Sequence, residues 1–147
     1  MLPLIKLVLT ILDLYLEIFH THHPLGDAYA YEEQKAAAKR RTKDFLRTRL
    51  PKFAGYFERV IERNHGRGPW MVGARLTCAD LTMAQVIAGL RYAFPKATAR
   101  ELRKRPRLCA LHDAVFDRPR IRRYVASGRR LPFNNHDLFR HYPELDR

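Results

Sequence analysis

Apolar and polar positions recur along this chain with the period of helices. Residues 46–60 carry apolar side chains at spacings of four and three, the pattern of a helix with one buried face: Leu46, Leu50, Phe53, Phe57 and Val60. Residues 72–94 differ, because beyond their first turn they leave almost no polar face, which is typical of a helix in the interior of a domain. No stretch shows the two-residue alternation of a strand. The sequence therefore predicts one all-α domain over residues 1–147, a bundle of five to six helices around residues 72–94.

The start of this central helix carries a specific signal. Thr77 can act as the N-cap, and Asp80 three residues later can accept a hydrogen bond from the Thr77 backbone N–H, a capping box with Asp in place of Glu. Leu76 and Leu81 have the spacing of a hydrophobic staple. Such a cap contributes about 1 kcal/mol, and the helix dipole favours a carboxylate in the first turn. Thr77 and Asp80 are therefore interpreted as a structural cap, with Asp80 not a catalytic acid.

The first helix is predicted to begin near Pro3, a residue suited to a first helical turn. Its apolar residues cover more than one stripe, which predicts contacts on two sides. Asp13 and Glu17 interrupt the apolar run and no basic segment precedes it, which argues against a signal peptide and a membrane span. Residues 20–31 contain Pro and Gly and are predicted to form a loop.

A long second helix is predicted over residues 32–63, kinked at Pro51 because proline removes a helical N–H. Gly66 and Gly68 can take positive φ where this helix ends. Residues 95–107 are predicted to be a link with one helical turn, followed by two shorter helices that end before Pro119 and at Gly128. The tail, residues 131–147, carries so many apolar side chains that it is predicted to pack back on the domain.

Charge and cysteine content add partners and a compartment to this prediction. With 28 basic and 15 acidic residues, the formal net charge is +13, which favours contact with nucleic acid, an anionic membrane or an acidic protein. The basic runs at 100–107, 118–123 and 129–130 contain few aromatic residues, so solvated charge is the favoured interpretation and nucleic-acid binding the alternative. Cys78 and Cys109 lack metal-ligand spacing and are predicted to be small buried residues of a cytoplasmic protein with no membrane partner.

The capping-box helix also carries a resemblance. Gly73, a short spacer, Leu76 and then the run TCADL at 77–81 resemble the capping-box helix of the glutathione S-transferase C-terminal domain. Residues 50–61 and 106–121 are similar to the helices before and after it in that family, so the resemblance covers nearly the whole chain. Members of the family begin with a thioredoxin-like domain, and the resemblance implies that the printed sequence corresponds to the region after it.

The resemblance implies a transferase that joins the glutathione thiolate to a small apolar electrophile. In the family, a hydroxyl of the thioredoxin-like domain hydrogen-bonds the thiolate and so lowers the pKa of the thiol. We therefore expect this chain not to be catalytic alone, and glutathione to act as co-substrate only together with that domain. The chain would supply a hydrophobic pocket wall and a dimer surface, with a second copy or a thioredoxin-like domain as its partner.

The resemblance also selects candidate site residues. The end of the first helix borders the electrophile pocket in the family, which makes Tyr15, Phe19, His20 and His23 candidate substrate-binding residues, together with Arg91 on the central helix. The histidines at 20, 22 and 23 could instead be a solvated cluster. No second histidine pair is spaced to complete a metal site, so no metal is predicted.

Asp13 is a lone carboxylate in an apolar helix. It either lies on an exposed stripe beside Lys6 or Glu17, or, as the resemblance to some classes implies, reaches across a dimer to the amino group of glutathione. Arg49 or Lys52 would then lie near the glycyl carboxylate.

Two alternatives to the transferase function stay open: a non-enzymatic protein- or RNA-interaction module of the same fold, and a truncated gene product.

Overall fold

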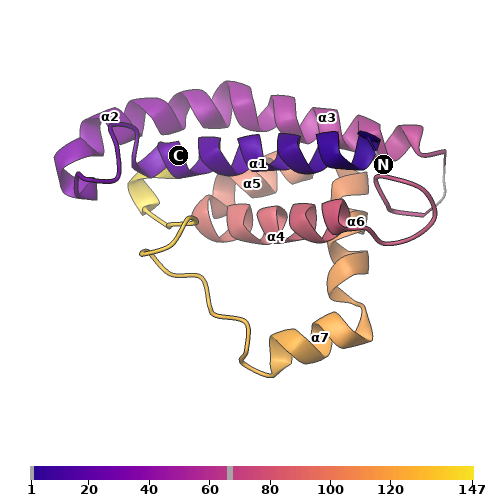
Figure 1. The fold of residues 1–147 in the computed structure, drawn as a ribbon. Helices are drawn as coiled ribbons and strands as arrows, with labels where there is room; N and C mark the ends of the chain where they lie inside the picture. The colour runs from indigo at the N-terminus through magenta and orange to yellow at the C-terminus, as the bar shows by residue number, and fades with distance from the viewer. Residues whose placement is uncertain (1, 66–67) are drawn as a thin grey trace.

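The computed structural model describes residues 2–65 and 68–147, so the prediction for Gly66 lies outside the described residues. The described part is helical: α1 (Leu2–His22), α2 (Tyr31–Asp44), the π-helix η1 (Phe45–Arg49), α3 (Leu50–Arg63), α4 (Cys78–Ala93), α5 (Pro95–Leu102), α6 (Pro106–Phe116), α7 (Pro119–Ala126) and the short 3₁₀ helix η2 (Pro143–Leu145). Because α2, η1 and α3 follow one another without a break, the prediction of an all-α bundle of five to six helices is confirmed. In Figure 1, α1 and the α2–η1–α3 helix form an upper layer, and α7 lies apart from both.

Helix α4 is the centre of the bundle, as predicted. It packs against α1, α5 and α6, and it buries a continuous set of apolar residues: Ala79, Met83, Ala84, Val86, Ile87, Leu90 and Ala93. The predicted capping box is formed, and the Asp80 carboxylate accepts the backbone N–H of Thr77 at 2.7 Å. The same carboxylate accepts the Thr77 hydroxyl at 2.7 Å and the backbone N–H of Met71 at 2.8 Å. The fully buried Asp80 thus joins the start of α4 to the preceding loop.

The prediction that both cysteines are buried is wrong for Cys78. Cys78 is the first residue of α4 and is exposed, whereas Cys109 on α6 is half-buried. The physical reason is helical register. Cys78 precedes the exposed Leu81 by three residues, so both lie on the solvent-facing side of α4.

At Pro51, where a kink is predicted, the structure has a π-helical turn directly upstream. Pro51 is the second residue of α3 and has no N–H to offer to the carbonyl of Arg47, four residues before it. Just upstream, the N–H of Leu50 donates to the carbonyl of Phe45, five residues back, which is the π-helical pattern. The helix therefore passes Pro51 with a change of register and without an interruption.

Residues 95–102 form a helix, which corrects the prediction of a link with a single turn. Pro95 occupies the first position of α5, where its missing N–H is harmless. The carboxylate of Asp146 in the tail accepts the backbone N–H groups of Lys96 and Ala97 at 2.7 and 2.9 Å. This cap comes from a residue far along the chain, so local sequence could not reveal it.

The tail packs back on the domain, as predicted. Phe139 and Leu145 are buried, and Phe133 stacks on Tyr92 of α4. Phe139 lies directly over Gly89, where a Cβ atom would come within 2.4 Å of the phenyl ring. Gly68 takes the predicted positive φ, at +95°. None of the helices in the described ranges is long and apolar enough to span a membrane.

Candidate functional site

Helix α1 has two apolar faces, and only one of them is covered. Its inner face packs against α2 and α4 and buries four residues: Leu7, Ile11, Leu14 and Ile18. Its outer face carries four aliphatic side chains that are 46–57% exposed: Ile5, Leu9, Leu12 and Leu16. We call these four residues the outer stripe. The expectation that α1 packs on two neighbours is thus confirmed by α2 and α4, and the outer stripe is left exposed.

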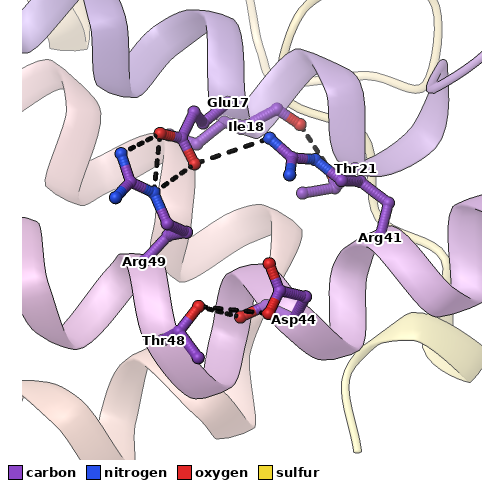
Figure 2. Close-up of polar contacts among 7 residues, drawn as sticks. All are labelled: Glu17, Ile18, Thr21, Arg41, Asp44, Thr48 and Arg49. Atoms are coloured by element: carbon purple, nitrogen blue, oxygen red, sulfur yellow. Dashed lines mark hydrogen bonds and ion pairs between the residues drawn. The ribbon is translucent and has the colours of Figure 1, made fainter.

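An ion-pair cluster joins α1 to the π-helical turn. Figure 2 shows Glu17 of α1 between two arginines of the long helix, Arg41 and Arg49. The Nε of Arg49 donates to both carboxylate oxygens of Glu17 at 2.8 and 2.9 Å, and Arg41 lies 3.6 Å from the same carboxylate. The hydrogen bonds to Glu17 raise the pKa of Arg49. The guanidinium predicted to meet a glycyl carboxylate is thus already held by Glu17.

Arg49 and Lys52 lie together at the edge of the outer stripe. Both line a hollow of about 360 Å³, with four further residues: Thr10, Phe53, Tyr56 and Arg59. Asp13 is exposed on α1 and is not among the lining residues. Of the three candidate glutathione contacts, the structure therefore brings Arg49 and Lys52 together and leaves Asp13 apart from them.

At its C-terminal end α1 carries a cluster of aromatic and histidine rings. Phe19 stacks on His23 with 5.4 Å between ring centroids, and its centroid lies 6.0 Å from that of the exposed His20. Tyr15, one turn earlier, packs on Phe139 at 5.5 Å, and burial raises the pKa of its hydroxyl. The structure thus places Phe19, His20 and His23 together, with Tyr15 beside the tail.

His22, which the sequence indicated only as a member of the histidine cluster, is buried and holds these rings in place. Its Nε2 lies 2.8 Å from the carbonyl oxygen of Leu138, so this nitrogen must carry the proton and donate. Its Nδ1 lies 2.6 Å from Nδ1 of His23, so in neutral His22 the proton between them belongs to His23. Burial lowers the pKa of His22 to about 4 and also lowers the pKa of His23. Burial therefore favours the neutral forms of both His22 and His23.

Arg91 does not belong to this cluster. It is exposed on α4, and its guanidinium nitrogen lies 3.2 Å from Nδ1 of His112 on α6. Among the residues that the structure describes, no three His, Cys, Asp or Glu side chains are placed to hold a metal ion.

The basic runs of the sequence lie in different environments. Within 100–107, Arg105 pairs with Glu101 at 2.8 Å and Arg107 with Glu62 at 3.3 Å. By contrast, Arg120, Arg123 and Arg129 line one hollow of about 360 Å³ with Tyr124 and Ser127. The three runs thus do not form one continuous surface of free cations.

Comparison with known proteins agrees with this architecture. Residues 20–128 match the family described as glutathione S-transferase, C-terminal domain. A glutathione S-transferase of Plasmodium falciparum (isolate 3D7) is 30% identical over 87 residues, which cover 56% of this chain and 39% of that protein. A glutathione S-transferase of Plasmodium yoelii yoelii is 30% identical over 83 residues, which cover 56% of this chain and 37% of that protein. The matched region thus spans less than half the length of these relatives. The family match covers most of the 147 residues and agrees with the capping-box helix and the all-helical fold, so the chain belongs to the glutathione S-transferase C-terminal domain family.

Proposed function

We propose that this chain is the helical part of a glutathione S-transferase-like protein, and that it supplies a dimer surface and one wall of an apolar electrophile pocket. The observation that carries the proposal is the outer stripe of α1. Four large aliphatic side chains in a row, about half exposed, form an apolar surface of the kind that marks a partner site.

The spacing of the outer stripe supports a helix as the partner. Ile5, Leu9, Leu12 and Leu16 follow one another at four, three and four residues, the a/d pattern of a two-helix seam. Lys6 and Asp13 are both exposed and seven residues apart, so they share one edge of this seam. In an antiparallel pair the same edges face each other, which sets Lys6 opposite Asp13 of a second copy. This charge complementarity favours a second copy over a thioredoxin-like domain as the partner.

The aromatic cluster at the end of α1 supports the pocket wall. Tyr15, Phe19 and His20 offer flat, largely apolar faces, and the buried His23 supports Phe19 from behind in the cluster held by His22. Such faces suit an apolar electrophile. Arg91 is the candidate with least support, because it contacts His112.

Among the candidate glutathione contacts, Lys52 has most support. It lines the hollow at the α1–α3 edge and forms no ion pair with any other described residue, whereas Arg49 is held by Glu17. A contact between Asp13 and glutathione stays a proposal that depends on the dimer.

We further propose that residues 1–147 do not activate the thiol themselves. Isothermal titration of this chain with glutathione should give no tight binding, and stoichiometric tight binding would contradict this part of the proposal.

The dimer surface has a direct test by sedimentation equilibrium. We expect a reversible dimer for the unmodified chain and a monomer for the Leu9→Glu/Leu16→Glu variant with unchanged circular dichroism. Leu131→Glu is the matched control, because Leu131 is 79% exposed and lies outside the stripe. A dimer that survives both stripe substitutions would refute the surface.

Charge reversal then tests the orientation. Lys6→Glu and Asp13→Lys should each weaken an antiparallel dimer, and the double variant should restore it. Failure of the double variant to restore the dimer would contradict the antiparallel arrangement. A monomeric chain that binds an isolated thioredoxin-like domain through the same stripe would assign the surface to that domain.

A second candidate function is RNA binding through α7. This helix buries no residue, and together with the segment after it the helix brings three arginines and Tyr124 around one hollow. RNA binding that falls steeply with salt, and that is lost in Arg120→Gln/Arg123→Gln, would favour this alternative.

A further inference from the structure

A second hollow, of about 560 Å³, lies between the long helix, α5 and the tail. Five basic side chains line it, with two leucines and one carboxylate: Lys39, Lys43, Arg47, Arg100, Arg147, Leu46, Leu145 and Glu144. We propose that this hollow binds a compact multivalent anion, one that carries several linked phosphate groups. The proposal does not depend on the transferase role.

One wall of the hollow is a row of like charges. Lys39, Lys43 and Arg47 follow one another at intervals of four residues along α2 and η1, so their side chains lie on one face of the helix. Like charges at this spacing repel and destabilise a helix. Within the part of the chain that the structure covers, none of the three forms an ion pair with a carboxylate, although Lys35, one turn earlier, pairs with Glu144 at 3.3 Å.

The opposite wall adds further positive charge. Arg100 of α5 donates at 3.0 Å to a backbone oxygen of Arg147, the last residue of the printed sequence, which holds the two residues side by side. The single lining carboxylate, Glu144, is already engaged by the Tyr31 hydroxyl at 3.0 Å and by Lys35. Cations on both walls thus converge on one space that holds one carboxylate side chain, that of Glu144, and the backbone oxygen of Arg147. A multivalent anion would neutralise several of them at once, which a single chloride cannot do.

The tail wall is fixed before any ligand arrives. Leu145 is buried, and Tyr142 stacks on Tyr31 with 3.7 Å between ring centroids. Asp146, also buried, caps α5 through the N–H groups of Lys96 and Ala97. Since the backbone on this side is already ordered, binding would restrict mainly the basic side chains, which lowers its entropic cost.

The size and position of the hollow favour a compact ligand over RNA. Its volume of about 560 Å³ lies in the usual range of small-molecule sites. The other group of arginines surrounds α7, which lies at the opposite end of the domain from α2 in Figure 1. The basic side chains therefore line separate hollows, whereas an extended nucleic acid needs a continuous basic track.

Isothermal titration with sodium tripolyphosphate at low ionic strength tests the proposal. We expect one site per chain, much weaker binding of inorganic phosphate, and at least a tenfold loss of affinity in Lys39→Gln/Arg47→Gln. Arg120→Gln/Arg123→Gln is the matched control, because it removes the same charge from the α7 hollow and should retain the affinity. Circular dichroism establishes that both variants are folded.

Two results would overturn the proposal. An equal loss of affinity in both double variants would mean that tripolyphosphate binding depends only on the net charge of the chain and not on this hollow. Binding of single-stranded RNA that tightens with length and weakens in both double variants would mean a nucleic-acid surface.

A ligand-free measurement supplies a second test of the same site. Because Lys43 stands between two like charges, Lys43→Gln should raise the Tm at low salt, and the difference should shrink at high salt. A lower Tm for Lys43→Gln would mean that the row of Lys39, Lys43 and Arg47 stabilises the fold, which contradicts a binding role.

Discussion

Arg49 donates two-pronged hydrogen bonds to Glu17, and this contact joins the π-helical turn to the first helix. Glu17 is 16% exposed and Arg49 is 34% exposed in their side chains, so the pair is partly shielded from water. Arg49 also lies over the ring of Phe53, 5.1 Å from its centroid. The guanidinium is the last basic group before Pro51, and the π-helical register directs it to α1.

Breaking the Glu17–Arg49 pair should destabilise the domain more than breaking a surface pair. Glu17→Gln and Arg49→Gln should each lower the Tm, and the double variant should lose less than the sum of the two, because both remove the same contact. The measurement is a double-mutant cycle by thermal denaturation. Arg122→Gln is the control, since Arg122 and Asp117 are 68% and 74% exposed and should contribute almost nothing. Additive losses at Glu17 and Arg49 would contradict the coupling.

Asp80→Ala should be among the most destabilising polar substitutions in the chain. It removes the acceptor for the N–H groups of Thr77 and Met71, and it leaves both donors without that partner at a buried site. We expect a loss of about 2–4 kcal/mol in the free energy of unfolding, measured by urea denaturation. Asp80→Asn should lose less, because its amide oxygen can still accept one bond. An unchanged urea midpoint for Asp80→Ala would contradict the capping role.

The sequence predicted the parts of the fold that depend on neighbouring residues. The capping box at Thr77 and the buried helix after it follow from spacings of a few residues, and the proline at 51 indicates locally altered helix geometry at that point. It did not predict α5 at its full length. The cap for this helix comes from Asp146, which lies 50 residues after its hydrogen-bond donor, Lys96. Contacts of that separation leave no local pattern.

The candidate site was predictable only in part, for a similar reason. His23 directly follows the last residue of α1, and its N–H still donates to the Phe19 carbonyl at 3.2 Å, so the proximity of Phe19 and His23 follows from helical geometry. The role of His22 depends on the Leu138 carbonyl, and the role of Arg49 depends on Glu17. Both partners belong to distant segments. The basic hollow was missed because only the Lys39, Lys43 and Arg47 row is visible locally, whereas Arg100 joins it through the fold.

Gly89→Ala should destabilise the domain even though alanine is the better helix former. A Cβ atom at this position would lie 2.4 Å from the ring of Phe139, which is itself buried between Tyr15 and Phe133. We expect a net loss of about 1–3 kcal/mol and faster proteolysis of the tail. Gly55→Ala is the control within a helix: its Cβ would meet only the flexible end groups of Arg59 and Arg105, at 3.3 and 3.4 Å, so helix propensity should leave its stability unchanged or raised. Equal stability for Gly89→Ala and the unmodified chain would contradict the close approach.

The stability of the domain should fall as the pH is lowered from 7 towards 4, in part through His22. In the unfolded chain His22 takes up a proton near its ordinary pKa of 6.5, whereas burial lowers its pKa in the folded state to about 4. Between these values the unfolded state binds more protons, so acid favours unfolding, by at most about 3 kcal/mol from this group. His23 and His112 add to the loss with the same sign, since burial lowers the pKa of each.

Urea denaturation of the unmodified chain and of His22→Gln at pH 7.5, 6.0 and 4.5 separates this contribution. The Gln amide can still donate to the Leu138 carbonyl but does not titrate, so the variant should start less stable and lose less stability on acidification. Protonation of His22 would put a second donor at the Nδ1 that now accepts from His23, so the loss of stability should come from breaking the His22–His23 contact, whereas the Nε2–H can still donate to the Leu138 carbonyl. Parallel pH profiles for the two proteins would show that His22 does not carry the acid sensitivity.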